Sequence, residues 1–176
     1  FISSIFAINV IDTILIDTSV SKVKWIGSKI SGSHNGEVAI KSGYILRDDT
    51  SLVGGEIVID MSSISVHDIE HSDWNQSLVD HLKNEDFFDV KKFPVAILQI
   101  LSSKKSLIKD KLNSNVEISG KLTIKNITNP ILIHSYIDFS KNISEGELII
   151  DRTKWDIKYG SSSFFDNLGD RAIYDD

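Results

Sequence analysis

The chain has 176 residues, of which 41% are hydrophobic and 25% are charged, a composition typical of one globular domain with a single core. Its formal net charge is -6 and it contains no cluster of Lys or Arg, which argues against nucleic acid as a partner. Cysteine is absent, which excludes disulfides, thiolate metal sites and cysteine nucleophiles formed by these residues.

The amino-terminal residues 1–11 (FISSIFAINVI) form an apolar run with small residues, which is typical of the end of a signal peptide. Ala7 is the candidate residue before the cleavage site, and the alternative is that the same run forms a first strand. No other segment approaches the roughly 18 apolar residues of a transmembrane helix. We therefore expect a signal-peptide remnant over residues 1–11 and one domain over residues 12–176, without an integral membrane segment.

After this run, apolar residues recur at every second position in short stretches, the pattern of antiparallel strands with one buried face. In residues 21–29, Val23 and Trp25 share a face, and the turn-forming residues 31–36 (SGSHNG) predict a hairpin. A second turn at residues 48–51 leads into a third strand. The predicted apolar faces of the second and third strands contain Val38, Ile40, Tyr44 and Leu46, and Ile57, Ile59 and Met61, respectively.

One segment has helical periodicity instead. Trp74, Leu78 and Leu82 recur every four residues after Ser72, a candidate N-cap. Residues 72–84 are therefore predicted to form a helix that packs across one end of the sheet.

Three phenylalanines follow, and Pro94 marks a position where a helix cannot continue and a strand can begin. Both faces of that strand are apolar, so its register stays open. Further strands are predicted at residues 116–125, 131–139 and 146–151, with a turn at residues 125–130. About eight strands and one helix predict one antiparallel barrel or sandwich. The interior of an eight-stranded barrel is filled by side chains or holds one small ligand, and periodicity leaves both open.

Four motifs, in order along the chain, resemble the YceI-like family. The most specific is HLKNEDFFDVKKFP over residues 81–94. The others are SKVKWIGSKISGSHNG (residues 21–36), GEIVIDMSSIS (residues 55–65) and ISGKLTIKNITNP (residues 118–130). The stretches DRT and DNLGDRAIYD, at residues 151–153 and 166–175, are similar to the tail of one subgroup, so the resemblance covers about residues 15–176.

The resemblance implies an all-β, eight-stranded lipocalin-like barrel with one helix covering an end, located in the bacterial periplasm or secreted. It further implies that the barrel encloses a polyisoprenoid, a prenyl quinone or a similar long-chain lipid, with no cofactor. The chain departs from the family pattern at Asn126, where glycine is frequent, and at Asp176, beyond which members usually continue into a last strand. We therefore expect the barrel to lack its closing strand, and a homodimer is left open.

The residues expected to line the ligand site are the inward residues of the strands together with the helix and the aromatic residues beside it. They are Val23, Trp25, Ile40, Ile57, Ile59, Trp74, Leu78, Leu82, Phe87, Phe88, Phe93, Ile97, Leu122 and Ile124. Trp155 is left open between core and pocket. We expect residues 74–93 to cover the opening through which the lipid exchanges, so charged residues in place of Phe87 and Phe88 are expected to abolish ligand retention.

Other functions receive less support. Residues 67–71 (HDIEH) match H-x-x-E-H, in which two histidines one helical turn apart bind zinc, but this run follows a predicted strand and favours a solvated loop. His81 is expected to form a hydrogen bond at the helix end, and Ser161 lacks the G-x-S-x-G elbow of a serine hydrolase. We predict no catalytic residue and no metal site. A structural or interaction domain with a filled core is the alternative to a carrier, and an enzyme acting on lipids is less favoured.

Overall fold

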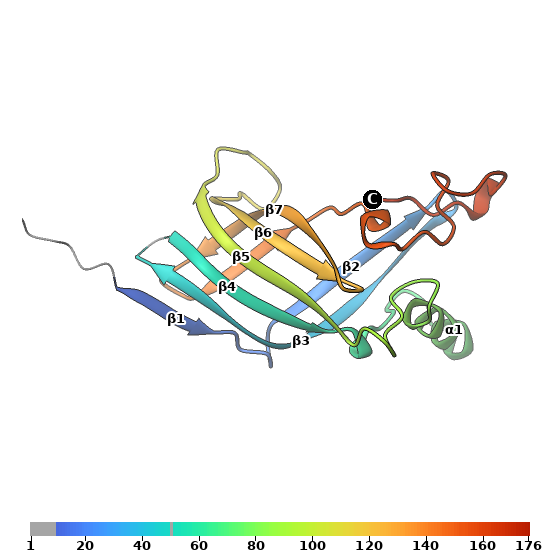
Figure 1. Cartoon of the computed structure of the whole chain (residues 1–176), viewed down its shortest axis with the longest axis horizontal. Helices are drawn as coiled ribbons and strands as arrows, with labels where there is room; N and C mark the ends of the chain where they lie inside the picture. Colours follow the sequence, from blue (N-terminus) through green and yellow to red (C-terminus); the bar gives the residue numbers. More distant parts are fainter. Residues whose placement is uncertain (1–9, 50) are drawn as a thin grey trace, which may run out of the picture.

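The computed structural model describes residues 10–49 and 51–176, and in these residues eight antiparallel strands form a curled sheet with one helix at one end (Figure 1). The strands are β1 (Ile11–Leu15), β2 (Lys22–Lys29), β3 (Gly32–Asp48), β4 (Ser51–Asp60), β5 (Val95–Lys105), β6 (Val116–Ile124), β7 (Ile127–Asp138) and β8 (Ile143–Glu147). The helix is α1 (Ser72–Lys83), and three 3-10 helices are η1 (Met61–Ser63), η2 (Arg152–Trp155) and η3 (Gly169–Arg171). Within the described ranges, no helix is long and apolar enough to cross a membrane.

The sheet has the strand order β1-β3-β4-β5-β6-β7-β8, and β2 lies beside β1 on the same edge of β3. β2 pairs with residues 32–39 of β3 and β1 with residues 44–48, so two short strands lie end to end along one long strand. In the described part of the chain, no ladder joins β8 to β1 or β2. The predicted all-β lipocalin-like class is confirmed, in the form of a half-barrel that is open along one side. Residues 1–9 of the predicted signal-peptide remnant lie outside the described residues, and Ile11 begins β1.

The turn between β2 and β3 is shorter than residues 31–36, so that prediction is wrong. The chain turns at Ile30 and Ser31, and Gly36 lies inside β3. Gly36 is needed for close approach: a Cβ atom there would lie 1.8 Å from the Ser65 carbonyl oxygen. The Trp25 indole N–H donates to this same oxygen at 3.1 Å, so the missing side chain makes room for the indole and the loop.

A bulge in β3 changes which of its residues face inward. The register shifts between Ile40 and Ser42, so Ile40 pairs with Ile59 but Gly43 pairs with Ile57. Since paired residues share a face of the sheet, Gly43 and Ile45 lie on the concave side. Tyr44, which is 39% exposed, and Leu46 lie on the other side, so the prediction that they share the face of Val38 is wrong.

The register of β5, which its sequence left open, is settled by burial. The strand begins directly after Pro94, as predicted. Ala96 and Ile100 are buried, and Leu98 lies on the same concave face. Ile97 lies on the convex face, so its prediction as a lining residue is wrong.

The β6–β7 hairpin has the predicted alternation but a tighter turn. Its two turn residues, Lys125 and Asn126, have φ values of 50° and 60°, the conformation of a type I′ turn. Asparagine tolerates this conformation better than most residues, which explains Asn126 at a position where the family often has glycine. β7 therefore begins at Ile127, inside the predicted turn, and β8 covers Ile143–Glu147 rather than residues 146–151.

Helix α1 docks through its second half. The N-cap is His71, not Ser72 as predicted, and its side chain makes no capping hydrogen bond. Val79 and Leu82 are buried, whereas Trp74 is 69% exposed and stacks on His71 with ring centroids 4.9 Å apart. The prediction that Trp74 lines the interior is therefore wrong, because its side chain is exposed and packs on His71 instead.

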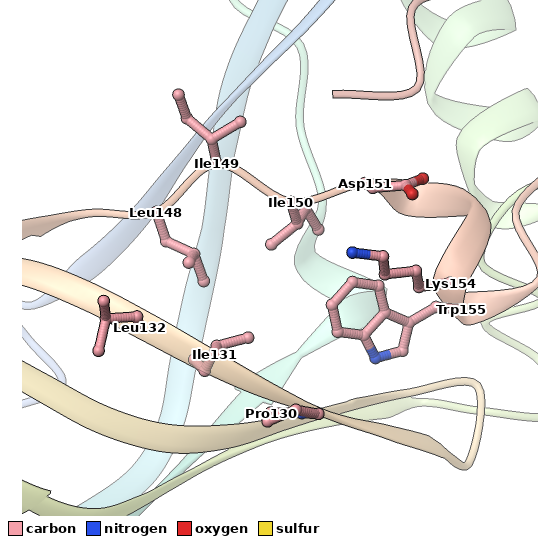
Figure 2. A pocket seen from close by; sticks show the side chains of 9 residues that line it. All are labelled: Pro130, Ile131, Leu132, Leu148, Ile149, Ile150, Asp151, Lys154 and Trp155. Atoms are coloured by element: carbon pink, nitrogen blue, oxygen red, sulfur yellow. The ribbon is translucent and has the colours of Figure 1, made fainter.

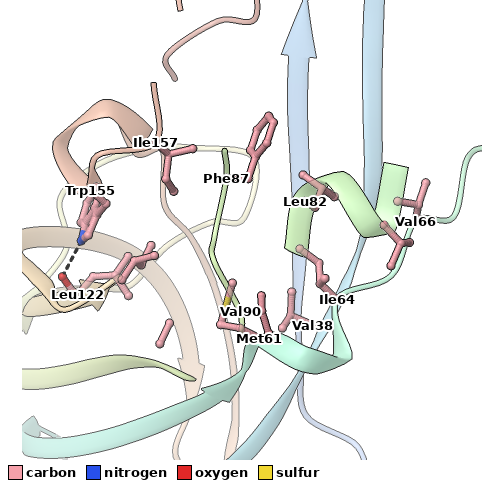
Figure 3. Close-up of a cluster of buried hydrophobic side chains, with 13 residues drawn as sticks. Val38, Met61, Ile64, Val66, Leu82, Phe87, Val90, Leu122, Trp155 and Ile157 are labelled. Atoms are coloured by element: carbon pink, nitrogen blue, oxygen red, sulfur yellow. Dashed lines mark hydrogen bonds between the residues drawn. The ribbon is translucent and has the colours of Figure 1, made fainter. Parts of the chain in front are cut away.

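Two clusters of buried side chains occupy the ends of the half-barrel. The capped-end cluster, at α1, contains Val38, Met61, Ile64, Val66, Val79, Leu82, Phe87, Val90, Ala96, Leu122, Ile124, Trp155 and Ile157 (Figure 3). The loop-end cluster, near the β3–β4 turn and the β5–β6 loop, contains Leu52, Ile100, Val116, Ile118 and Ile137. On the concave face between these clusters, Ile40 and Ile57 belong to neither cluster.

Candidate functional site

Apolar side chains cover the concave face between the two clusters. We call this surface the trough and define it by Ile40, Gly43, Gly55, Ile57, Leu98 and Ile131. Ladder pairing places them on one face: Gly43 pairs with Ile57, and Ile57 pairs with Leu98. The four large side chains are half-buried, and among the described residues Ile40 and Ile57 pack against neither cluster. Leu98 and Ile131 also pack against the capped-end cluster. Ile40 and Ile57, which are half-buried and packed in neither cluster, are therefore the candidate ligand contacts of this surface.

Glycines permit the curvature that creates the trough. A Cβ atom on Gly43 would lie 2.9 Å from the Glu56 carbonyl oxygen, and one on Gly55 would lie 2.7 Å from the Tyr44 carbonyl oxygen. On β6, a Cβ atom on Gly120 would lie 2.5 Å from the Gln99 carbonyl oxygen. Glycine inside a strand marks a tight bend or a close approach of backbones. These positions therefore let β3 to β6 curl around the concave face.

Most of the predicted lining residues do lie together, but mainly as core. The capped-end cluster, with the side chains packed against it, contains Val23, Trp25, Ile59, Leu78, Leu82, Phe87, Phe88, Leu122 and Ile124. Ile40 and Ile57 belong to the trough. Phe93 is half-buried outside both clusters, with the Lys92 ammonium 5.0 Å from its ring centroid. Sequence reasoning missed Leu98 and Ile131, whose inward orientation depends on strand register.

The α1 end of the half-barrel is closed by aromatic packing. The His81 ring meets the Tyr159 and Phe87 rings edge to face, with centroids 4.5 and 5.0 Å away. Trp155 is only 2% exposed and its indole N–H donates to the Leu122 carbonyl oxygen at 3.0 Å, so this residue is core (Figure 3). Buried side chains of residues 74–93, among them Leu82 and Phe87, fill this end, and the role of the segment in lipid exchange stays a prediction.

A pocket opens at the side of the half-barrel, where β8 separates from β7. The β7–β8 ladder ends at the pair His134 and Glu147, and the described residues provide no partner strand on that side of β7 from Ile127 to Ile133. Pro130, which lacks an N–H, is tolerated at such a free edge. The side pocket is lined by Pro130, Ile131, Leu132, Leu148, Ile149, Ile150, Asp151, Lys154 and Trp155 (Figure 2).

Ile131 lines the side pocket and also lies on the concave face, so it belongs to both the pocket and the trough. The volume of the side pocket is about 230 Å³. Pockets for drug-sized ligands span about 300–1,000 Å³, so the side pocket accepts one end of a long chain rather than the whole molecule. A second pocket, of about 250 Å³, lies at the loop end, beside Lys104, Lys105 and Phe139.

Arg152 anchors the carboxy-terminal segment, a role that sequence reasoning did not identify. Its guanidinium donates to four carbonyl oxygens, of Ile157, Tyr159, Ile173 and Tyr174, and to the Asp175 carboxylate at 3.4 Å. Burial lowers the pKa of Arg152 from its ordinary value, against the opposing effect of nearby carboxylates. The resemblance of residues 151–153 (DRT) to the family was the sequence signal that could have drawn attention to this role of Arg152.

The segment held by Arg152 returns to the opposite edge of the sheet. Ile173 forms a bridge with Lys29 of β2, and the Tyr174 N–H donates to the Ser28 carbonyl oxygen at 2.9 Å. The carboxy-terminal segment therefore joins the two sides of the half-barrel at the α1 end.

The polar motifs singled out in the sequence have structural contacts. Residues 67–71 form a loop before α1, not the helix that a zinc protease requires. In this loop, Asp68 binds the Asn35 backbone N–H at 2.8 Å and His34 at 2.7 Å. The hydrogen bond from the Asn35 N–H is the main cause that lowers the pKa of Asp68; burial opposes it, and the His34 hydrogen bond lowers the pKa further. Ser161 is buried in a turn, and residues 10–49 and 51–176 contain no group of three metal-binding side chains.

The chain matches one family model and is similar to solved structures. A family model described as YceI-like domain matches residues 15–175. The crystal structure of BcnA from Burkholderia cenocepacia is 20% identical, covers 91% of this chain and 92% of its own, and superposes with a TM-score of 0.63. A YceI protein of Campylobacter jejuni is 16% identical over 97% of this chain and 84% of its own, with a TM-score of 0.47. No curated protein matches the sequence.

Proposed function

Because the chain belongs to the YceI-like domain family, we propose that it binds a long apolar lipid, such as a polyisoprenoid or a prenyl quinone, along the trough. The observation that carries this proposal is the half-buried apolar surface between two filled ends. A side chain such as Ile57 is neither packed into a cluster nor fully exposed to water. A bound chain would complete its burial.

The driving force is the transfer of apolar surface from water. Each buried CH₂ group contributes about 0.8 kcal/mol, so a lipid of some dozens of carbons needs only part of its length in the trough to bind tightly. This mechanism is passive and uses no cofactor. The protein would then carry or sequester the lipid, in the periplasm or after secretion.

Extraction of the purified protein tests this proposal against a filled-core domain. The protein is produced in a bacterial host, with export, and extracted with organic solvent, and the extract is analysed by mass spectrometry. We expect about one prenyl lipid or other long-chain lipid per protein molecule. An unrelated exported β-protein of similar size, treated identically, provides the control, and an extract with no lipid above that background would contradict the proposal.

A further inference from the structure

The loop between β5 and β6 combines basic and apolar side chains at one end of the molecule. Residues 104–111 (KKSLIKDK) contain four lysines and one aspartate, a net charge of +3 in a chain whose formal net charge is -6. The interpretation that the chain contains no cluster of Lys or Arg is therefore wrong for this loop. Figure 1 shows the loop projecting from the ends of β5 and β6, away from α1 and apart from the β3–β4 turn, where Asp48 and Asp49 lie.

Most of the positive charge of this loop is free to meet a partner. Lys104 is paired with Glu117 at 2.6 Å. The Asp110 carboxylate is occupied within the loop, since its Oδ1 atom accepts a hydrogen bond from the Ser114 backbone N–H at 2.9 Å. The other three lysines are exposed and have no hydrogen-bond or ion-pair partner within the described ranges; they are Lys105, Lys109 and Lys111.

The tip of the same loop exposes apolar side chains. Leu107 is 89% exposed, more than any other large hydrophobic residue in the described part of the chain, and Ile108 is 48% exposed. A single exposed leucine is common on a protein surface, but these two neighbours lie between lysines on both sides. Apolar side chains flanked by lysines are typical of segments that lie in the interface of an anionic membrane.

The base of the loop is fixed, so the tip is presented in a defined direction. The Ser106 N–H donates to the Asn115 carbonyl oxygen at 2.9 Å, and the Asn115 N–H donates to the Ser135 carbonyl oxygen at 3.0 Å. The Asn115 side chain also binds the backbone N–H and carbonyl oxygen of Ile137, both at 2.9 Å, which attaches the loop to β7. A fixed base reduces the conformational entropy that the loop loses when it meets a surface.

We infer that the β5–β6 loop docks the protein on the surface of an anionic phospholipid membrane. Leu107 and Ile108 enter the interface, and the three free lysines lie among the lipid phosphates. Sites that bind nucleic acid stack aromatic side chains on bases or read base edges with polar ones, whereas the tip of this loop presents leucine and isoleucine. The inference goes beyond the proposed function, because the loop meets the membrane from outside and needs no lipid in the trough.

Vesicle flotation with the whole chain tests the charge requirement. The vesicles are phosphatidylcholine alone, or phosphatidylcholine and phosphatidylglycerol in equal amounts. The loop variant combines Lys105→Gln, Lys109→Gln and Lys111→Gln. The control variant removes the same charge from exposed positions of β2, β3 and β6; it combines Lys24→Gln, Lys41→Gln and Lys121→Gln.

A second pair of variants tests the apolar tip. Leu107→Ser removes the most exposed leucine of the loop, and Leu15→Ser makes the same change at the end of β1, where the side chain is 78% exposed. Thermal unfolding checks that every variant is folded.

We expect the wild type to bind the mixed vesicles at least about 10-fold more tightly than phosphatidylcholine alone. Each lysine near an anionic surface strengthens binding about fivefold, so the loop variant should bind the mixed vesicles about 100-fold more weakly. Leu107→Ser should weaken binding about 10-fold, and both controls should stay within about twofold of the wild type. Added salt should weaken binding of the wild type.

The inference is overturned if the wild type binds both kinds of vesicle equally, or if the loop variant and its control lose the same affinity. It is also overturned if duplex DNA, and not the mixed vesicles, binds in a way that depends on the loop lysines. Titration with a labelled prenyl lipid reports on the trough separately, and the loop variant should keep the wild-type affinity. Loss of this affinity in the loop variant would place the loop in the lipid site and contradict docking. A wild type that floats with the mixed vesicles but binds no prenyl lipid contradicts the proposed function alone.

Discussion

Glutamate in place of Ile57 is expected to weaken the binding of a long-chain lipid by about 100-fold. Ile57 lies at the centre of the trough, paired with Gly43 on one side and Leu98 on the other. A carboxylate there keeps its water and displaces about four CH₂ groups of the lipid, which corresponds to about 3 kcal/mol. Fluorescence titration with a labelled prenyl lipid measures the loss.

The neighbouring residue provides a matched control. Val58 directly follows Ile57 on β4 but lies on the convex face. Val58→Glu therefore adds the same charge without touching the trough. Thermal unfolding of both variants checks that the sheet is intact. Equal lipid affinity in Ile57→Glu and Val58→Glu, with both proteins folded, would mean that the trough is not the binding surface.

Leucine in place of Arg152 is expected to lower the free energy of unfolding by about 3 kcal/mol, because truncating one side of a buried, charge-assisted network leaves its acceptors unpaired. The Arg152 side chain is 13% exposed, and its five acceptors all belong to residues 157–175. Urea unfolding measures the change. Lysine at this position keeps the charge but not the forked geometry, so Arg152→Lys should fall between the wild type and Arg152→Leu.

Arg171→Leu is the control for this prediction, since Arg171 is exposed at the end of η3. It should change the unfolding free energy by less than about 0.5 kcal/mol. If Arg152→Leu were as stable as Arg171→Leu, the carboxy-terminal segment would not depend on the Arg152 hydrogen bonds.

The sequence predicted the strands in which alternation continues without interruption. In β6, every second residue from Val116 to Ile124 is buried, and the charged residues between them face outward. Prediction failed where one inserted residue reversed the pattern. The bulge after Ile40 in β3 moved Tyr44 to the convex face, and the apolar residues on both faces of β5 gave no signal to separate Ile97 from Leu98.

The site was less predictable than the fold because it depends on contacts between distant segments. Periodicity identified α1 but not that only its second half docks, so Trp74 was placed inside although it is exposed. The glycine at position 36 was interpreted as a turn residue, whereas it makes room for Trp25 and for the loop at Ser65. The side pocket exists because β8 leaves β7 early, which no local pattern around Pro130 reveals.

Intermolecular nuclear Overhauser effects between a bound prenyl lipid and the methyl groups of the protein test the central claim most directly. Uniformly labelled protein with unlabelled lipid distinguishes the two faces of the same strands, because Ile57 and Leu98 face the trough while Val58 and Ile97 face outward. We predict contacts from the lipid chain to the methyl groups of Ile57, Leu98 and Ile131. Contacts confined to Val58 and Ile97, with none to the trough, would contradict it.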